Sequence, residues 1–567
     1  MTGPIERTGG SGPSDDTVVL PVVPASPPPP EETGSVARNS ATMALGSIVS
    51  RVTGLVRTAA IVAALGGYLV GDAYNLANTL PNMVYELLLG GVLASVIVPV
   101  LVRARRTDAD RGEAYAQRLL TLAVVCFGVA TVLAVLAAPL FTAVLATDAA
   151  ADDRELITQL AYLLLPEIFF YGLAAIFAAI LNTRGHFAAP MWTPILNNLV
   201  VIATAVAFLA LLPRVDRDSA SSMTAAHVLV LGLGTTLGIV VQAVGLWPAL
   251  RRAGFRWRWR WDFRALGLRE LARLGSWMLL FVAVSQVGVV VVLMIAKKAA
   301  NDGGFGPVVF NTGFLLFMMA HGIVAVSIIT ALLPRMSAAA ADGRHADLAE
   351  QLALGTRLAA VILVPTAAAY VVLGQPIAVV LFQRGQYDTS AAVATGWVIA
   401  VAGVALVPYT ISQLQLVTFY ALSDTRTPAL INIPVVALRL SVDIALWLVL
   451  PATVVVAGLM AGSAISFVAG AVLGYWLLRR RLGPLGLAAV ARGLARLGLA
   501  GIVGAVPAAA VVWGVRAVAG DGWWPSLGQL VGGGATLLAG YVGAAVLLRV
   551  PEVGQVGRTL RGRIRRS

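Results

Sequence analysis

Cysteine, histidine and charged residues are scarce in this chain of 567 residues. Cys126 is the single cysteine, so an internal disulfide bond is excluded. The four histidines are dispersed along the chain, which argues against a histidine metal site. Charged residues make up 12% of the chain and hydrophobic residues 58%, a balance that soluble globular proteins do not reach. The sequence therefore predicts a polytopic membrane protein.

Features of nucleic-acid-binding proteins and of ATP-driven transporters are also lacking. The net charge of +13 comes from basic residues between apolar spans, which indicates orientation in a membrane and no nucleic-acid partner. Arginine alternates with aromatic residues at 255–261, but the position between two spans favours an interfacial linker that contacts anionic lipid. No Walker phosphate loop occurs. We expect neither ATP hydrolysis, nor other enzyme activity, nor a cofactor.

Apolar spans of about 20 residues predict an all-α fold with fourteen transmembrane helices. The N-terminal tail is rich in glycine and proline and lacks an apolar core, so it is expected to be disordered. The expected regions are a disordered cytoplasmic tail at 1–38, a six-helix bundle at 39–250, a basic and aromatic cytoplasmic linker at 251–273, a second six-helix bundle at 274–481, two additional transmembrane helices at 482–549 and a basic cytoplasmic tail at 550–567.

The connections between spans alternate in charge. Those after even-numbered spans are basic, whereas the connection at 147–155 is acidic. By the positive-inside rule, both termini are predicted to be cytoplasmic. Lys297 and Lys298 lie at a predicted outer end and are the exception; we interpret them as snorkelling to the interface.

An internal repeat links the two bundles. VSRV at 49–52 recurs as VSQV at 284–287, an offset of 284 − 49 = 235, and Pro99 recurs as Pro334 with the same offset. Six spans separate each pair, so the bundles have the same orientation and form a parallel repeat, an architecture of alternating-access transporters. Gln286 corresponds to Arg51, which predicts that positive charge is concentrated in the first bundle.

Two arginines, Arg51 and Arg57, lie within the first span. An arginine at the centre of a bilayer helix costs about 2.5–3.5 kcal/mol, so both are expected to face a polar cavity or a partner. Their spacing of six residues is about 9 Å along a helix, close enough for both to reach one large anion. A buried ion pair with Glu86 or Glu167 is the structural alternative.

Other charged residues within spans allow more than one interpretation. Asp72, near the outer end of the second span, is either a functional acid or a helix cap. Glu167 is either a partner for an arginine or a protonated carboxyl group. Arg439 and Asp443 are four residues apart, so they lie on one helix face and can form an ion pair.

Several short motifs occur in a fixed order along the chain. They are SRVxGxxR at 50–57, DA at 72–73, LPN at 80–82, LFQRG at 381–385 and FYALxDTxTP at 419–428. With these motifs, residues 40–550 resemble the MurJ/MviN family, the bacterial lipid II flippases of the multidrug/oligosaccharide-lipid/polysaccharide exporter superfamily.

The resemblance implies a V-shaped pair of bundles around a cationic cavity in the bacterial inner membrane. The substrate it implies is a polyprenyl-diphosphate-linked disaccharide-pentapeptide, carried from the cytoplasmic to the outer leaflet. The family's functional residues correspond to Arg51, Arg57, Asp72 and Asn82, and Glu86 is a further candidate beside them. Many members carry charged residues where this chain has Tyr85, Gly90, Phe314 and Leu315, which implies a smaller anion site here.

The coupling ion and three rival functions stay open. Some family members are held to bind sodium near the position of Asp443, but Arg439 would place a fixed positive charge there. A MATE-type drug/cation antiporter would have an acidic cavity. The sequence is also compatible with a flippase for a different polyprenyl-diphosphate oligosaccharide and with a non-transporting scaffold for cell-wall synthesis proteins.

Overall fold

The structure is a computed structural model that describes residues 30–89, 97–266 and 268–550, and these ranges form helices joined by loops, without a β-strand. The first bundle holds α1 (Pro30–Leu65), α2 (Leu69–Leu89), α3 (Val98–Thr107), α4 (Glu113–Leu136), α5 (Ala138–Leu145), α6 (Ala151–Leu164), α7 (Glu167–Thr183), α8 (Ala188–Leu211) and α9 (Ala225–Arg252), with the short η2 (Ala220–Ser222) before α9 and η3 (Phe263–Leu266) after it.

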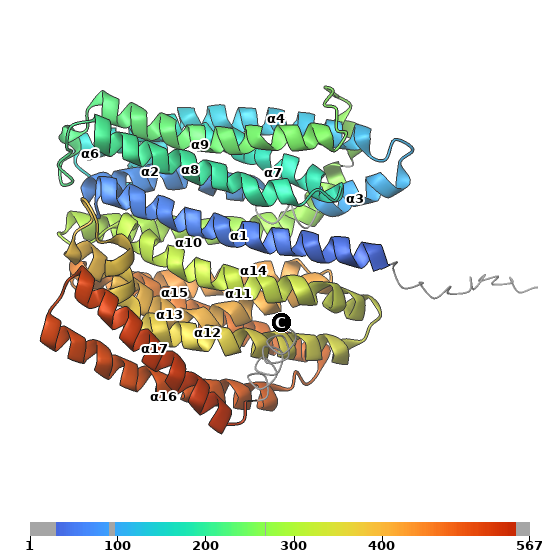
Figure 1. The fold of residues 1–567 in the computed structure, drawn as a ribbon. Helices are drawn as coiled ribbons and strands as arrows, with labels where there is room; N and C mark the ends of the chain where they lie inside the picture. The colour runs from blue at the N-terminus through green and yellow to red at the C-terminus, as the bar shows by residue number, and fades with distance from the viewer. Residues whose placement is uncertain (1–29, 90–96, 267, 551–567) are drawn as a thin grey trace, which may run out of the picture.

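The second bundle lies beside the first, and a helix pair flanks it (Figure 1). Its members are α10 (Leu268–Asn301), α11 (Pro307–Ala341), α12 (His345–Phe382), α13 (Thr389–Ala421), α14 (Arg426–Val449) and α15 (Ala452–Leu482). The pair α16 (Leu487–Ala519) and α17 (Trp523–Leu547) packs against α12. We call the end that holds loops 66–68, 302–306 and 383–388 the outer end, following the positive-inside prediction.

The α16–α17 pair shows how these helices approach one another closely. A Cβ on Gly540 of α17 would lie 2.9 Å from the Cα of Gly504 in α16, so only glycine fits at this crossing. Lipid tails are as apolar as the side chains, so helix association in a membrane depends on such close backbone packing.

Thirteen helices within the described ranges are long and apolar enough to cross a membrane. This confirms an all-helical, multi-pass membrane fold, but it does not confirm the expected count of fourteen. The predicted second span, 71–102, is the one that falls short. Its helix α2 contains Asp72, Glu86 and several asparagines, and residues 90–96 lie outside the described residues.

Two expected boundaries are corrected. Residues 1–29 lie outside the described residues, but α1 begins at Pro30, so the prediction of disorder through residue 38 is wrong for 30–38. Proline is accepted in the first turn of a helix, and the next proline in the chain is Pro81. Helix α10 begins at Leu268, so residues 268–273, expected in the linker, are helical. The basic C-terminal tail lies outside the described residues from 551 onward.

The linker between the bundles is attached to the first bundle. Gln117 of α4 donates from Nε2 to the Arg256 carbonyl (2.7 Å) and accepts from Arg260 Nε (2.8 Å). Arg118, also on α4, forms an ion pair with Asp262 (2.6 Å). The linker's rings follow one another with centroids 4.7–5.9 Å apart, in the order Trp257, Trp259, Trp261 and Phe263.

The two bundles contain similar asparagine contacts. In the first, Asn198 of α8 donates from Nδ2 to the Ser50 carbonyl (3.1 Å) and to Thr53 Oγ1 (2.9 Å) of α1. In the second, Asn432 of α14 donates from Nδ2 to the Phe281 carbonyl and to Ser285 Oγ of α10, both at 2.9 Å. These contacts are what a parallel duplication of one helical frame would produce.

Candidate functional site

A polar cavity of about 360 Å³ lies between the bundles, with walls from α1, α2, α7, α8, α9 and α11. Its charged residues are Arg57 and Glu167. Side-chain amides dominate the rest of the polar wall, and an amide both donates and accepts hydrogen bonds. The amide and phenol groups belong to Asn75, Asn78, Asn82, Asn197, Asn311, Tyr74 and Tyr171.

Arg57 and Glu167 share the cavity without forming an ion pair. Within the described ranges, no nitrogen of Arg57 or Arg51 lies within 4.0 Å of a Glu167 oxygen, and the expected pairing of Glu167 with an arginine is therefore wrong. Glu167 is buried, and its Oε1 accepts from Thr236 Oγ1 at 3.4 Å. The Arg57 guanidinium thus lines the cavity without a carboxylate at ion-pair distance.

Arg51 lies elsewhere: it does not line the cavity but reaches across to the second bundle. Its guanidinium packs against Gly322 of α11, where a Cβ would lie 2.3 Å from Nη1. The neighbouring His321 is hydrogen-bonded to Thr410 Oγ1 at 3.1 Å. The structure therefore assigns the two arginines different surroundings, Arg57 in the cavity wall and Arg51 between α1 and α11.

The three other candidate site residues, all on α2, lie in different surroundings. Asn82 lines the cavity. Asp72 is fully buried outside it, and its Oδ1 accepts from the Val308 backbone N–H at 2.8 Å. Asp72 thus caps the N-terminus of α11, a helix of the other bundle. Glu86 is half-buried and is not part of the cavity wall.

Arg439 and Asp443 lie as their spacing predicts, with Arg439 Nε 3.5 Å from Asp443 Oδ2. Asp443 is fully buried, and a Cβ on Gly462 of α15 would lie 1.9 Å from its Oδ1. A sodium ion at this carboxylate would sit beside a fixed guanidinium charge, so these residues do not fit a sodium site. The described part of the chain contains no group of three or more acidic, histidine or cysteine residues that could hold a metal.

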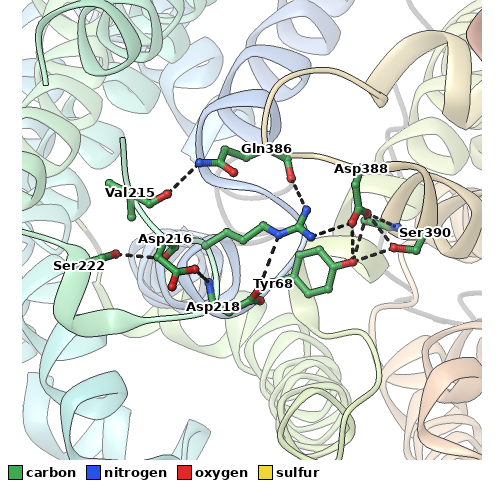
Figure 2. Close-up of polar contacts among 10 residues, drawn as sticks. Tyr68, Val215, Asp216, Asp218, Ser222, Gln386, Asp388 and Ser390 are labelled. Carbon is green, nitrogen blue, oxygen red and sulfur yellow. Dashed lines mark hydrogen bonds and ion pairs between the residues drawn. The ribbon is translucent and has the colours of Figure 1, made fainter. Parts of the chain in front are cut away.

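A polar network joins the bundles at the outer end (Figure 2). Arg217 Nη2 lies 2.9 Å from Asp388 Oδ2, and Arg217 Nη1 donates to the Gln386 carbonyl (3.1 Å). Tyr68 donates its hydroxyl to Asp388 Oδ2 (2.9 Å). Although partial burial raises the pKa of Asp388, hydrogen bonds from Ala391 N–H, Ser390 and Tyr68 and the Arg217 charge lower it overall. The LFQRG motif, just before these residues, was the only sequence signal for this network.

A comparison with known families extends these observations. A family model described as "Lipid II flippase MurJ" matches residues 61–527. Two similar proteins carry the name "Probable lipid II flippase MurJ". The one from Rhizobium meliloti is 26% identical over 73% of this chain and 76% of its own length. The one from Synechocystis sp. is 26% identical over 93% of this chain and 97% of its own length.

Solved structures show the same fold. A structure titled "Lipid II flippase MurJ, inward closed conformation" superimposes with a TM-score of 0.68 at 16% identity, covering 89% of this chain and 98% of that one. An inward-facing multidrug resistance MATE family transporter of the MOP superfamily gives a TM-score of 0.61 at 16% identity, covering 77% of this chain and 95% of that one.

Proposed function

Because this chain belongs to the lipid II flippase MurJ family, we propose that it moves lipid II across the bacterial cytoplasmic membrane by alternating access. The cargo would be the polyprenyl-diphosphate-linked disaccharide-pentapeptide, carried from the inner to the outer leaflet. Transport of this kind makes and breaks no covalent bond in the cargo.

The polar cavity between the bundles carries this proposal. Arg57 lines it without an ion-paired carboxylate, and arginine grips phosphate oxygens with a planar fork of fixed charge. The surrounding asparagines, Asn75, Asn78, Asn82, Asn197 and Asn311, supply donors and acceptors that suit sugar hydroxyls and peptide amides. The outer network of Arg217, Asp388 and Tyr68 joins the bundles at the outer end, which favours entry of the cargo from the inner side.

Arg51 would contribute at a different point of the cycle. Its guanidinium packs on Gly322 of α11, so Arg51 forms a contact between the two bundles. We expect the diphosphate to pass this contact. A diphosphate entering between the bundles would offer this guanidinium a stronger partner than the apolar helix surface. Asp72 and Glu86, which lie outside the cavity wall, would not contact the cargo in this conformation.

Drug/cation antiport is less well supported. The similarity to the MATE family transporter is at 16% identity and concerns the fold. A cavity for organic cations would be acidic, whereas this wall holds one arginine, Arg57, against one glutamate, Glu167. The amide-rich lining favours a neutral, hydroxylated headgroup with a compact anionic part.

We further propose that both termini are cytoplasmic and that membrane lipids are in direct contact with the spans. Cysteines placed singly at positions 150 and 344, in a Cys126→Ala background, test the orientation. External labelling at 150 and protection at 344 are expected in intact cells. The reverse pattern would show that the outer end has been assigned to the wrong side.

Depletion of the protein in its bacterial host tests the function itself. We expect peptidoglycan synthesis to halt while lipid II accumulates in the inner leaflet, measured by the accessibility of lipid II to an externally added headgroup-modifying enzyme. Normal appearance of lipid II in the outer leaflet after depletion would favour the scaffold function.

A further inference from the structure

A second polar pocket lies at the outer end, separate from the central cavity. It has a volume of about 400 Å³. Two of its carboxylate residues, Asp72 of α2 and Asp153 of α6, are 0% and 2% exposed, and Lys297 of α10 is 2% exposed. Asp153 Oδ2 lies 2.5 Å from Lys297 Nζ, so Lys297 does not snorkel to the interface as the sequence suggested.

The charges of this pocket do not balance. Each carboxylate other than Asp72 has a cation within ion-pair distance, with Lys298 shared with Asp302 and Arg217 shared with Asp388. Asp72 has none at that distance in the described part of the chain. The pairs are Asp153 with Lys297, Asp148 with Lys298 (3.2 Å) and Asp218 with Arg217 (3.7 Å). A buried, uncompensated carboxylate is costly, and such a group is expected to bind a proton or a cation.

Two oxygens in the pocket lack hydrogen-bond partners. Asp72 Oδ1 accepts from Val308 N–H, but Asp72 Oδ2 and Asp153 Oδ1 are buried without any partner. Gly306 leaves no spare room at Oδ2, since a Cβ there would lie 2.0 Å from it. A proton needs no such room, whereas a metal ion needs several oxygens around it and would be repelled by Lys297.

Asp72 also lies between the two pockets. Its chain neighbours Gly71 and Asn75, and its hydrogen-bond donor Val308, line the central cavity, whereas its own side chain lines the outer pocket. Opening the outer end would separate α2 from α11 and expose this carboxylate to water. Closing the outer end buries it again.

We propose that the Asp72 carboxylate, beside the Asp153–Lys297 pair, is a binding site for one transported or gating proton. The proton is taken from water onto Asp72 Oδ2 when the outer end closes, and it is released when the outer end opens. The proton neutralises the one carboxylate that lacks a cation, so closure of the outer end is linked to external pH. This inference does not depend on which lipid the cavity carries.

The other ionisable groups around Asp72 do not account for a dependence of outer-end closure on external pH. The Asp153–Lys297 pair is already compensated, and both residues lie within electrostatic reach of Asp72. Tyr387 donates to or accepts from Thr395, and Tyr68 donates to Asp388; both are uncharged at neutral pH. Because the pKa of Asp388 lies below its usual value of 3.8, its contribution is lost only in stronger acid, so the outer network stays ionised at neutral pH.

The distance between the bundles at the outer end tests the proposal without lipid II. Spin labels would be placed at Ser221→Cys and Arg384→Cys in the Cys126→Ala background, with the full chain in lipid nanodiscs. We expect the label distance to increase as the pH rises from about 5 to about 9, because deprotonation of a buried carboxyl group destabilises the closed end. Asp72→Asn keeps the acceptor for Val308 N–H and should hold the distance short at every pH.

Matched variants separate the possible causes of a pH response. Asp388→Asn, which changes a carboxylate of the outer network, should keep the pH response of the parent. Gly306→Ala should displace the Asp72 carboxylate and give a long distance at every pH. A pH response that survives in Asp72→Asn, or is abolished by Asp388→Asn, overturns the proposal. A change on replacing sodium by choline at constant pH also overturns it, because a metal ion would then be the occupant.

Discussion

The two bundles share one frame but differ in chemistry. Asn198 holds α8 to α1 as Asn432 holds α14 to α10. Ser50, which Asn198 contacts, corresponds by the offset of the repeat (50 + 235 = 285) to Ser285, which Asn432 contacts. Arg57 in the cavity wall corresponds by that offset (57 + 235 = 292) to Val292, which is 2% exposed in an apolar core. The duplicated contacts therefore preserve helix packing, while the ionisable groups differ between the copies.

Aromatic packing occupies the second bundle where the first presents polar groups. Phe314 stacks between Phe310 and Phe317, with ring centroids 5.9 and 5.4 Å away. At a position where the family resemblance implied a charged residue, this chain has a stacked ring. Both charged residues of the cavity wall, Arg57 and Glu167, belong to the first bundle, whereas the second bundle contributes uncharged residues, among them Asn311 and Thr312. We therefore expect recognition of an anionic cargo to depend mainly on the first bundle.

The largest effect is expected at the first-bundle arginines. Arg57→Ala should nearly abolish transport at unchanged abundance, and Arg51→Ala should do the same, with Arg51→Lys intermediate. Charge-assisted contacts contribute about 1.5–3 kcal/mol each, so lipid II binding by purified protein should fall by roughly tenfold or more per arginine removed. Arg516→Ala, which removes an exposed pair with Asp521, is the matched control. Alanine variants that bind and transport normally would make both arginines structural.

A large effect on stability is expected in the second bundle. Arg439→Ala leaves the buried Asp443 without its partner, which costs about 3–5 kcal/mol, whereas replacing both residues by leucine should be much milder. Thermal unfolding in detergent measures the difference. If the double variant loses transport as completely as Asp443→Asn while both remain folded, Asp443 has a role beyond pairing and ion coupling must be reconsidered.

Gly322→Ala tests the contact between the bundles. The new methyl group would overlap the Arg51 guanidinium and displace it, so lipid II binding should weaken by less than in Arg51→Ala. Gly498→Ala is the matched control, because its Cβ meets no other atom within 4 Å. Equal binding by the two alanine variants would show that the position of Arg51 against α11 is unimportant.

The smallest effect is expected outside both bundles. Deleting residues 1–29 should leave transport almost unchanged, because their composition cannot build a packed element. Extending the deletion to residue 36 removes the first turns of α1 and should reduce abundance in the membrane. Complementation and membrane abundance, measured together, distinguish a required partner of the tail from loss of folding.

The sequence predicted the fold class well because span length, charge alternation and the repeat can be read from the chain without knowing how the helices pack. It also identified Arg57 and Asn82, which line the cavity, and the Arg439–Asp443 pair, whose spacing settles their geometry. The helix cap that Asp72 forms on α11, 236 residues away, depends on how the bundles meet and has no local signal.

Contacts that depend on how the bundles meet also explain the wrong predictions. Lys297 looked like an interfacial residue because its partner, Asp153, is on a helix of the other bundle. Glu167 looked like an arginine partner because both are charged residues in apolar spans, but the cavity separates their side chains beyond ion-pair distance. Orientation of side chains around a shared cavity cannot be read from one span at a time.

The attachment of the linker to α4 limits where the chain can bend between the two bundles. Residues 256–262 are fastened to Gln117 and Arg118, so this arginine- and tryptophan-rich segment moves as part of the first bundle. Rocking of one bundle against the other must then be accommodated along the chain where α10 begins, near residue 268. The rings of Trp257, Trp259 and Trp261, in contact with one another, would then keep their position relative to the first bundle while the second bundle moves.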